Sequence, residues 1–274
     1  MKVLVAGARG FLGSAACSTL IGAGHDVVGI SRTAHAGMAT ADLEDSGSVI
    51  SLLNATRPEV IVNCAARVDF GIDILPTLFS VNALLPALMA QWCRANGGYL
   101  VQASTIAVHG AQVREAGSQT PDRPDTDYGR SKWLAERNID QSGCRAVSLR
   151  LSGLFGRSGP AHLGLNRALR AASKGEPPTL VGQGTARRNY LFVHDAAAVI
   201  AYCVQSRPEG VRWVGGSQIL TMRQMLDTIC EVYLPSKAPV GSAGLEAADQ
   251  IVLHSQDMPA GRSFREALEY ERTR

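Results

Sequence analysis

The sequence predicts an α/β protein built on a doubly wound parallel sheet, with a smaller portion towards the C-terminus. Short apolar runs alternate with longer segments of helical periodicity over the first 156 residues. This alternation is typical of parallel strands joined by helical crossovers. Right-handed crossovers would place helices on both faces of the sheet. The 274 residues are enough for one large domain and a small appendage.

Five apolar runs are the expected strands, because they are short and end at glycine, alanine or polar residues. They are residues 2–7, 26–31, 59–66, 99–105 and 145–156. The segments between them carry apolar residues at helical spacing. The expected helices are 11–24, 46–56, 74–97 (interrupted or offset by Pro86) and 128–142.

The pattern loosens after Gly156. The expected elements are a helix within 159–178, a strand and helix over 188–206, a strand at 210–216, and helices at 220–234 and 263–271. Residues 235–249 are the most linker-like stretch, and we expect them on the surface.

The composition argues against several classes of protein. A net charge of +3 and 5% aromatic residues give no reason to expect a nucleic-acid partner. The six cysteines form no CxxC pair and the six histidines show no ligand spacing, so we expect reduced thiols and no metal. No apolar run reaches membrane-spanning length and the first residues lack a signal-peptide pattern. These features predict a cytoplasmic protein with no membrane partner.

A glycine-rich turn joins the first strand to the first helix. In "GARGFLG", Gly7, Gly10 and Gly13 follow the pattern G-x-x-G-x-x-G. Glycines let the backbone approach a pyrophosphate closely, and the helix N-terminus offers N–H groups to it. The turn predicts a Rossmann-type dinucleotide site, although a tight turn without a ligand would use the same residues.

The end of the second strand indicates which dinucleotide is bound. A site selective for NAD places an acidic residue here, whereas this chain has Ser31 and Arg32. Arg32, together with Arg9 of the glycine-rich turn, could bind a 2′-phosphate. We therefore expect NADPH, with NAD as the alternative; two solvated arginines are the other reading.

Tyr128 and Lys132 lie one turn apart on a helix that we expect to begin at Thr126 or Asp127. A neighbouring ammonium lowers the pKa of a phenol and equips it to exchange a proton with a substrate oxygen. By itself the pair also fits two surface residues that never meet.

Together these segments resemble the extended short-chain dehydrogenase/reductase family of sugar-nucleotide epimerases, dehydratases and reductases. The likeness covers nearly the whole chain and includes "QASTIAVHG", "YGRSKWLAE" and "RRNYLFVHDAA". It implies a catalytic triad of Thr105, Tyr128 and Lys132. In that family's chemistry the tyrosine exchanges the proton, the lysine binds the nicotinamide ribose, and the threonine orients the reacting oxygen.

The resemblance also implies the binding residues. Cofactor contacts would come from Gly7, Arg9, Gly10, Phe11, Leu12, Gly13, Ser31, Arg32, Asp42, Leu43, Cys64, Ala65, Ala66, Asn82, Tyr128, Lys132, Leu151, Gly153 and Leu154. Substrate contacts would come from Arg67, Thr105 and Arg188, with Asp69 as a further candidate. Arg67 and Asp69 could equally be solvated loop residues. His109 replaces the family's usual aromatic residue, and the short C-terminal portion implies a smaller or differently closed pocket.

The expected domains are a dinucleotide-binding domain over 1–156 with part of 186–215, and a substrate-binding portion over 157–185 and 216–274. The leading function is NADPH-dependent reduction of a keto-sugar nucleotide. An NAD-dependent sugar-nucleotide epimerase or dehydratase is the alternative, because the triad serves both chemistries. An NADP-binding redox sensor is an alternative of another class. We also expect a homodimer, since the helices at 75–95 and 128–142 carry apolar residues beyond one face, including Trp92 and Trp133.

Overall fold

The computed structural model describes residues 1–68, 72–161 and 163–273. Asp69, a candidate substrate contact in the sequence, lies outside these ranges. The chain forms two compact units. The larger comprises Met1–Ala111, Pro121–Arg150 and Ala197–Arg212, and the smaller comprises Gln112–Thr120, Leu151–Ala196 and Trp213–Arg274.

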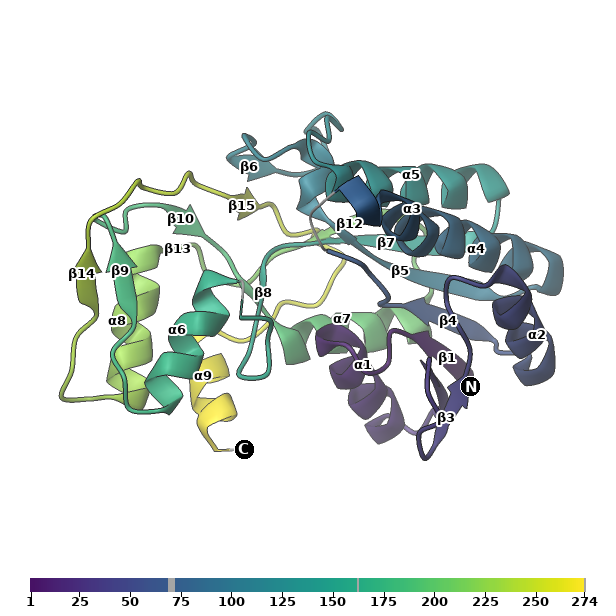
Figure 1. Ribbon diagram of the computed structural model, residues 1–274, viewed down its shortest axis with the longest axis horizontal. Coiled ribbons are helices and arrows are strands. Elements are labelled where there is room, and N and C mark those ends of the chain that lie inside the picture. The colour runs from purple at the N-terminus through teal and green to yellow at the C-terminus, as the bar shows by residue number, and fades with distance from the viewer. Residues whose placement is uncertain (69–71, 162, 274) are drawn as a thin grey trace. The chain divides into compact units, whose positions relative to one another are not determined.

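A seven-stranded sheet organises the larger unit, in the order β12-β7-β5-β4-β1-β2-β3 (Figure 1). Its strands are β1 (Lys2–Ala6), β2 (Asp26–Ser31), β3 (Met38–Thr40), β4 (Val60–Asn63), β5 (Tyr99–Thr105), β7 (Arg145–Leu151) and β12 (Gly210–Val214). β1 pairs in parallel with both β2 and β4, and the β2–β3 and β4–β5 pairs are also parallel. The predicted doubly wound sheet is confirmed. The strand order reverses direction at β1, where such sheets bind their ligands.

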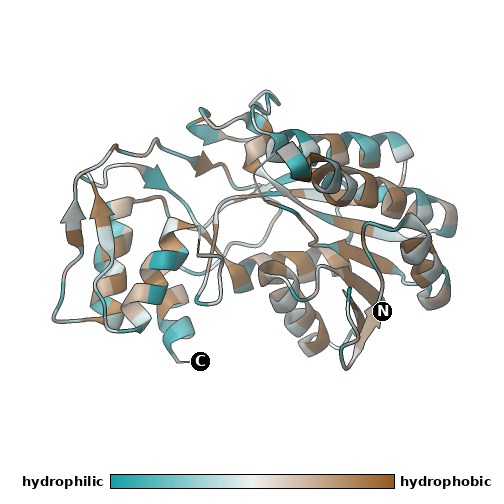
Figure 2. Ribbon diagram, viewed as in Figure 1, coloured by the Kyte–Doolittle hydropathy of each residue, from teal (hydrophilic) through white to brown (hydrophobic). Residues whose placement is uncertain are grey.

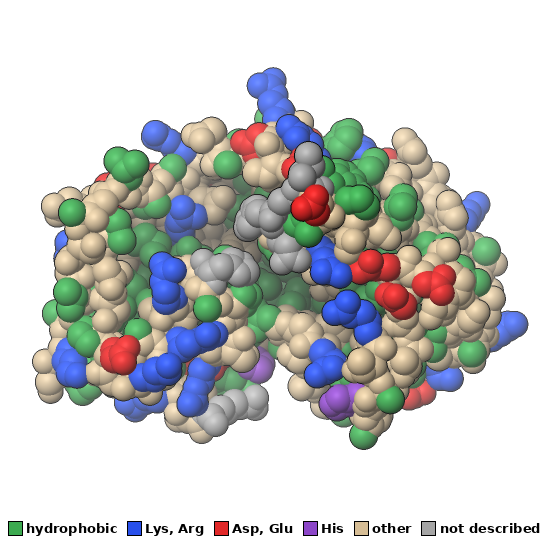
Figure 3. All heavy atoms as spheres, viewed as in Figure 1, with side chains coloured by type: hydrophobic (Ala, Val, Ile, Leu, Met, Phe, Trp, Pro, Cys, Tyr) green, Lys and Arg blue, Asp and Glu red, His purple; other side chains and the backbone are tan. Residues whose placement is uncertain are grey.

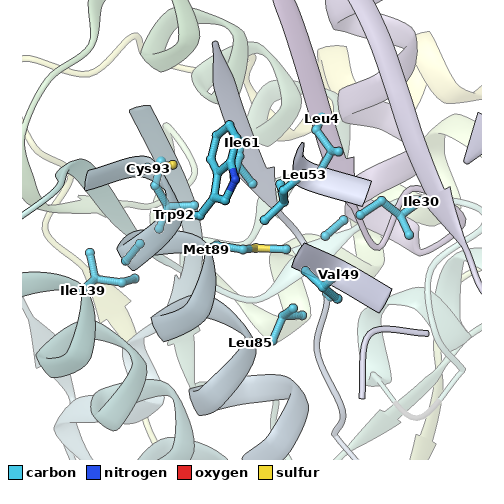
Figure 4. Packing of buried hydrophobic residues seen from close by; sticks show 14 of the residues in the cluster. Leu4, Ile30, Val49, Leu53, Ile61, Leu85, Met89, Trp92, Cys93 and Ile139 are labelled. Carbon is cyan, nitrogen blue, oxygen red and sulfur yellow. The ribbon is translucent and has the colours of Figure 1, made fainter. Parts of the chain in front are cut away.

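The helices of this unit surround the sheet and contribute buried apolar side chains to the core. They are α1 (Phe11–Gly22), α2 (Ser46–Thr56), α3 (Leu75–Phe79), α4 (Leu85–Asn96), α5 (Asp127–Ser142) and the greater part of α7 (Val193–Ser206). Leu4, Ile30 and Ile61 on the strands pack against Leu53 of α2 and Met89 of α4 in one buried cluster (Figure 4). Figure 2 shows apolar residues both on strands of the large sheet and on the helices around it.

The helix expected over residues 74–97 forms, and its predicted interruption lies directly before Pro86. A π-helical turn, Ser80–Leu84, stands between α3 and α4, and the backbone stays helical at both junctions. Pro86, the second residue of α4, has no N–H to donate to the turn before it. A π-helical turn of this kind often marks a functional site, and it contains Asn82.

Trp92 contributes to the core and not to a surface for a second subunit. Its side chain is 6% exposed, and its Nε1 donates to Asn54 Oδ1 of α2 at 2.8 Å. The sequence interpretation of Trp92 as an apolar residue beyond the packed face of its helix is therefore wrong. Trp133 on α5 is half-buried.

The smaller unit combines short paired strands with three helices. The helices are α6 (Gly164–Ser173), α8 (Met222–Tyr233) and α9 (Phe264–Arg272). The strand pairs are β8 (Leu154–Phe155) with β11 (Leu191–Phe192), β9 (Thr179–Val181) with β14 (Val240–Ser242), β10 (Arg187–Arg188) with β13 (Leu220–Thr221), and β6 (Glu115–Ala116) with β15 (Ile251–Val252). Capping boxes at Thr221 and Ser263 fix the starts of α8 and α9.

Among the described residues, no helix combines the length and apolar character needed to cross a membrane. Within the same residues, no three histidine, cysteine, aspartate or glutamate side chains gather as metal ligands would. On the face shown in Figure 3, basic and acidic side chains are interspersed with hydrophobic and uncharged ones.

Candidate active site

Four loops follow neighbouring strands at the carboxyl edge of the large sheet. They begin after β1, β2, β4 and β5, at Gly7, Arg32, Cys64 and Ile106. The parallel register pairs Ala6 with Asn63, and Asn63 with Gln102, so these strands end at the same edge. The sequence motifs therefore meet at the point where the strand order reverses, although they are far apart along the chain.

The glycine-rich turn has the geometry of a phosphate cradle. Gly7 has φ 74°, and a side chain there would lie 2.7 Å from the backbone nitrogen of Ala65. A Cβ on Gly13 would lie 2.0 Å from the Gly7 carbonyl oxygen, so α1 reaches the turn only without one. The N-cap, Gly10, has no side chain that could accept from the first N–H groups of α1. Phe11 and Leu12 are the first two residues of this helix. These residues fit a dinucleotide pyrophosphate, which needs close backbone approach and free N–H groups.

Polar side chains bring the glycine-rich turn close to the end of β2. Arg9 Nη1 donates to Thr33 Oγ1 at 3.5 Å, and the Thr33 N–H donates to Ser31 Oγ at 3.4 Å. Arg9 and Arg32 are both exposed. Thr33 was not singled out from the sequence; its position beside Ser31 and Arg32 was the available signal.

The loop after β3 lies beside this region. Asp42 accepts a hydrogen bond from the Glu44 N–H at 3.1 Å, which shapes the turn, and Leu43 is half-buried. The structure thus gives Asp42 a local role in the loop and leaves the side chain of Leu43 partly accessible.

Buried amides hold the loop Cys64–Ala66. Asn63 Oδ1 accepts from the Ala65 N–H at 3.1 Å, and Asn63 Nδ2 donates to Gln102 Oε1 at 2.9 Å. Asn63 and Gln102 are both fully buried, so neither amide exchanges its partner for water. Gln102 joins β5 to this loop. We missed both residues in the sequence because they look like ordinary strand residues.

Asn82 connects the same loop to α5. Its Oδ1 accepts from the Arg67 N–H and its Nδ2 donates to the Arg67 carbonyl, each at 2.8 Å. Nδ2 also lies 3.1 Å from Ser131 Oγ. The Arg67 side chain meets Glu44 at 2.8 Å. Asn82 therefore fixes the backbone of the loop, while the guanidinium of Arg67 is held by a carboxylate.

The start of α5 brings Tyr128 to Thr105. Thr126, one of the two starts that the sequence predicted, caps the helix by accepting from the Gly129 N–H at 3.0 Å. A Cβ on Gly129 would lie 2.5 Å from the Ala107 carbonyl oxygen, so only glycine allows this approach of α5 to the turn after β5. The Thr105 side chain lies near enough to the Tyr128 phenol to lower its pKa, and its Oγ1 accepts from the Ala107 N–H at 3.2 Å.

Burial sets the protonation of Tyr128. It raises the pKa of the phenol to about 12, against the lowering effect of the nearby Thr105 side chain. The sequence led us to expect a lowered pKa. The direction is reversed because loss of hydration outweighs the favourable contacts of the phenolate.

Lys132 lies one turn after Tyr128 on the same helix, and it is 2% exposed. Its Nζ donates to the Ala103 carbonyl at 3.0 Å, and Gln102 Nε2 donates to the same oxygen at 2.8 Å. Burial lowers the pKa of Lys132 to about 8, opposed by Cys64 and Glu136. The ammonium is therefore anchored to β5 and points towards the loop that contains Cys64.

A buried ion network lies one turn further along α5. Glu136 accepts from Ser104 Oγ at 2.5 Å and from Arg150 Nη2 at 2.6 Å. Arg150 also meets Asp122 at 2.7 Å and His109 Nε2 at 3.1 Å. Since arginine only donates, His109 Nε2 accepts and its Nδ1 donates to the Pro121 carbonyl at 3.1 Å. Burial is the main cause that lowers the pKa of His109, so the neutral ring belongs to this network.

The remaining expected residues belong to the smaller unit. Leu151 and Leu154 flank Gly153, whose carbonyl accepts from the Leu191 N–H at 2.9 Å. Arg188 donates to Gln250 Oε1 at 2.6 Å and to the Ala248 carbonyl at 3.1 Å. It lines a cavity of about 560 Å³ within this unit. That volume is in the usual range of small-molecule sites.

Most of the chain matches the model of a known protein family. The model of the NAD dependent epimerase/dehydratase family matches residues 3–214. The chain belongs to this family. It carries the family's NAD(P)-binding Rossmann fold, and the resemblance inferred from the sequence is confirmed.

Individual relatives differ in what they act on. The dTDP-4-dehydrorhamnose reductase of Streptomyces griseus is 34% identical over 57% of this chain and 51% of its own length. A 3-diazoavenalumate denitrifying reductase of a Streptomyces species is 30% identical over 77% of this chain and 74% of its own. The UDP-glucose 4-epimerase of Thermus thermophilus, solved with NAD, has a TM-score of 0.81 and 26% identity, covering 99% of this chain and 97% of that one. The chain spans about half the length of several curated relatives that it matches.

Proposed function

We propose that this protein is an NADPH-dependent reductase of a keto-sugar nucleotide. The observation that carries the proposal is the cluster of Thr105, Tyr128 and Lys132 at the edge where the strand order reverses. Thr105 would hold the substrate oxygen, Tyr128 would give it a proton, and Lys132 would bind the cofactor ribose. Bound NADPH would supply the hydride.

The protonation of Tyr128 is compatible with reduction. Burial raises the pKa of its phenol to about 12, so the proton that a donor needs is present at neutral pH. An ordinary tyrosine is also protonated there, so the choice of reduction over epimerisation rests on the cofactor residues described next. The alternative, an NAD-dependent epimerase, draws support from the relative solved with NAD.

The choice of NADPH rests on Arg9, Ser31, Arg32 and Thr33. The two arginines are exposed, and Arg9 reaches Thr33 at the end of β2. Residues 31–37 contain no carboxylate that could bind a free ribose 2′-hydroxyl. Two guanidinium groups and two hydroxyls suit a 2′-phosphate.

The sugar-nucleotide substrate is inferred from Arg188 and the family. Arg188 lines the cavity of the smaller unit and has neutral acceptors for its guanidinium, so its charge is available to a diphosphate. Arg167 lines the same cavity. Contacts of the substrate with Arg67, and of the cofactor with Leu151, Gly153 and Leu154, belong to this proposal.

We further propose a homodimer in the cytoplasm. The exposed Leu84, 61% accessible, and the half-buried Trp133 and Leu134 provide apolar surface on the π-helical turn and α5. Light scattering at micromolar concentration would give twice the chain mass, and a monomer would contradict the proposal.

The function is tested with dTDP- and UDP-linked 4-keto sugars. Oxidation of NADPH, followed at its absorbance band, would give a product reduced at the keto carbon, with Tyr128→Phe as the inactive control. Denatured protein would release little bound NAD. Stoichiometric NAD, with interconversion of epimers without added cofactor, would establish the epimerase instead.

A further inference from the structure

Residues 243–249 of the smaller unit, which we call the strap, are attached almost entirely by polar contacts. The strap begins after β14, which pairs with β9, and ends before Gln250, whose N–H donates to the Arg187 carbonyl at 2.9 Å. Residues 243–248 are all exposed, and the Leu245 side chain is 96% accessible. With no buried apolar anchor, the strap depends on its polar partners to stay in place.

The principal partner is a group of backbone N–H donors. Glu246 Oε1 accepts from the N–H groups of Gln183 and of Gly184, the latter at 2.9 Å, and Oε2 accepts from Thr185 at 3.3 Å. We call residues 183–185 the nest. Successive N–H groups converge here because Gly182 and Gly184 have φ values of 63° and 66°. Such a concavity binds anions, and in this structure the anion is the chain's own carboxylate.

The strap also engages the two arginines that follow the nest. Asp249 meets Arg187 at 2.9 Å, and Ala248 accepts from Arg188 at 3.1 Å. Donors between Gln183 and Arg188 are thus matched by acceptors between Glu246 and Asp249 of the strap. This is the arrangement in which an extended anionic ligand, such as a diphosphate, would be bound.

The nest opens on the cavity assigned to the substrate. Gly184, Arg188, Leu245 and Glu246 all line the cavity of about 560 Å³. A ligand in this cavity therefore meets the nest, one cation and the inner side of the strap together.

We propose that the nest is a phosphoryl-binding site for the substrate and that Glu246 occupies it as a tethered competitor. The inference rests on the proposed function. Entry of the substrate diphosphate displaces the Glu246 carboxylate, and the strap detaches from the nest. The apparent affinity for substrate is then lower than the intrinsic affinity by the fraction of molecules whose nest is free.

The sign of a mutational effect distinguishes a competitor from a structural residue. Glu246→Gln keeps the shape of the side chain and removes its charge, and neutral hydrogen bonds are roughly half as strong as charge-assisted ones. The variant should bind phosphate ligands more tightly, by roughly three- to tenfold. Loss of a purely structural contact would weaken binding.

The experiment uses inorganic pyrophosphate and UDP as probes, in calorimetric titrations of the full chain saturated with NADPH. Glu246→Gln and Glu246→Ala should both bind more tightly than the wild type. Glu231→Gln is the matched control, because it removes one negative charge from α8, where Glu231 pairs with Arg265. It should change affinity less than about twofold. Unchanged or weaker binding by both Glu246 variants would overturn the proposal.

Hydrogen–deuterium exchange locates the effect. Pyrophosphate should protect the N–H groups of residues 183–185 and increase exchange in residues 243–249 of the wild type. Unaltered exchange in both segments would also overturn the proposal. The binding and exchange measurements need no turnover. If the protein reduced no keto-sugar nucleotide, the proposed function would be disproved, but the measured competition between Glu246 and phosphate ligands would still stand.

Discussion

Replacing Arg150 by methionine should destabilise the larger unit severely. Arg150 is the hub of the buried network, with its side chain 3% exposed and that of Glu136 1% exposed. In Arg150→Met, Glu136 keeps Ser104 as a donor but loses its counter-charge in a buried site. Removing one partner of a buried ion pair typically costs about 3–5 kcal/mol, because the other charge is left uncompensated.

The same strand provides a control. Arg145 of β7 meets Glu209 at 2.7 Å, but the two side chains are 59% and 56% exposed. Arg145→Met should therefore cost at most about 1 kcal/mol. The double variant Arg150→Met/Glu136→Gln leaves no buried carboxylate unpaired. It should be more stable than Arg150→Met alone, although it has lost one more native group.

Thermal unfolding measures these differences. In a protein of this size roughly 2–4 °C of melting temperature corresponds to 1 kcal/mol, so Arg150→Met should melt about 10 °C below the wild type. Arg145→Met should melt within about 4 °C of it. Equal losses for the two single variants would refute the reasoning, as would a double variant less stable than Arg150→Met.

The remaining predictions concern chemistry, cofactor, turn geometry and pH. Tyr128→Phe should keep its affinity for NADPH in fluorescence titrations and lose turnover by roughly a thousandfold, because only the proton donor is removed; activity within a few-fold of wild type would assign the proton elsewhere. Arg32→Ala should weaken NADPH binding about tenfold and spare NADH, since a charge-assisted contact is worth about 1.5–3 kcal/mol; equal losses would mean that Arg32 does not contact a 2′-phosphate. Gly13→Ala should abolish binding of both cofactors in the same titrations, because its Cβ would lie 2.0 Å from the Gly7 carbonyl, and retained binding would contradict this close packing. The pKa of His109 is lower in the folded protein than in the unfolded chain, so protonation favours the unfolded chain and the free energy of unfolding falls as pH drops below about 6.5. His109→Phe should flatten this pH dependence in denaturant titrations between pH 7 and 5.5, and an unchanged slope would show that another group titrates.

Local pattern was sufficient for much of the fold. The alternation of apolar runs and helical segments predicted the parallel sheet. Thr126 was one of two predicted starts of its helix, with Asp127, and a cap can be predicted because its hydroxyl acts on the next turn of the same helix. Pro86 predicted an interruption of the helix over residues 74–97, and the π-helical turn lies directly before it. The pattern did not reveal the π-helical form of that turn, since apolar residues continue through it without a change of composition.

The residues of the candidate site also fall into two groups, those recognised from the sequence and those that only the structure placed. Gly7, Gly13, Thr105, Tyr128 and Lys132 were recognised from short motifs whose spacing reflects local geometry. Their assigned roles in binding and catalysis remain predictions.

Gln102, Glu136 and Arg150 could not be placed from the sequence. Each lies on a different element, and their contacts join residues up to 41 positions apart, as in the Arg150–His109 pair. Trp92 was misjudged for the same reason, because its partner Asn54 belongs to another helix.

The sequence by itself determined the family's architecture, the glycine-rich turn after β1 and the helical spacing of Tyr128 and Lys132. These follow from interactions within a few residues. Only the tertiary structure decided the direction of the Tyr128 pKa and the neutral form of His109, and only it showed Glu246 held by the nest. Hydration and charge compensation depend on which groups from distant segments surround a side chain, and the packed chain alone specifies those neighbours.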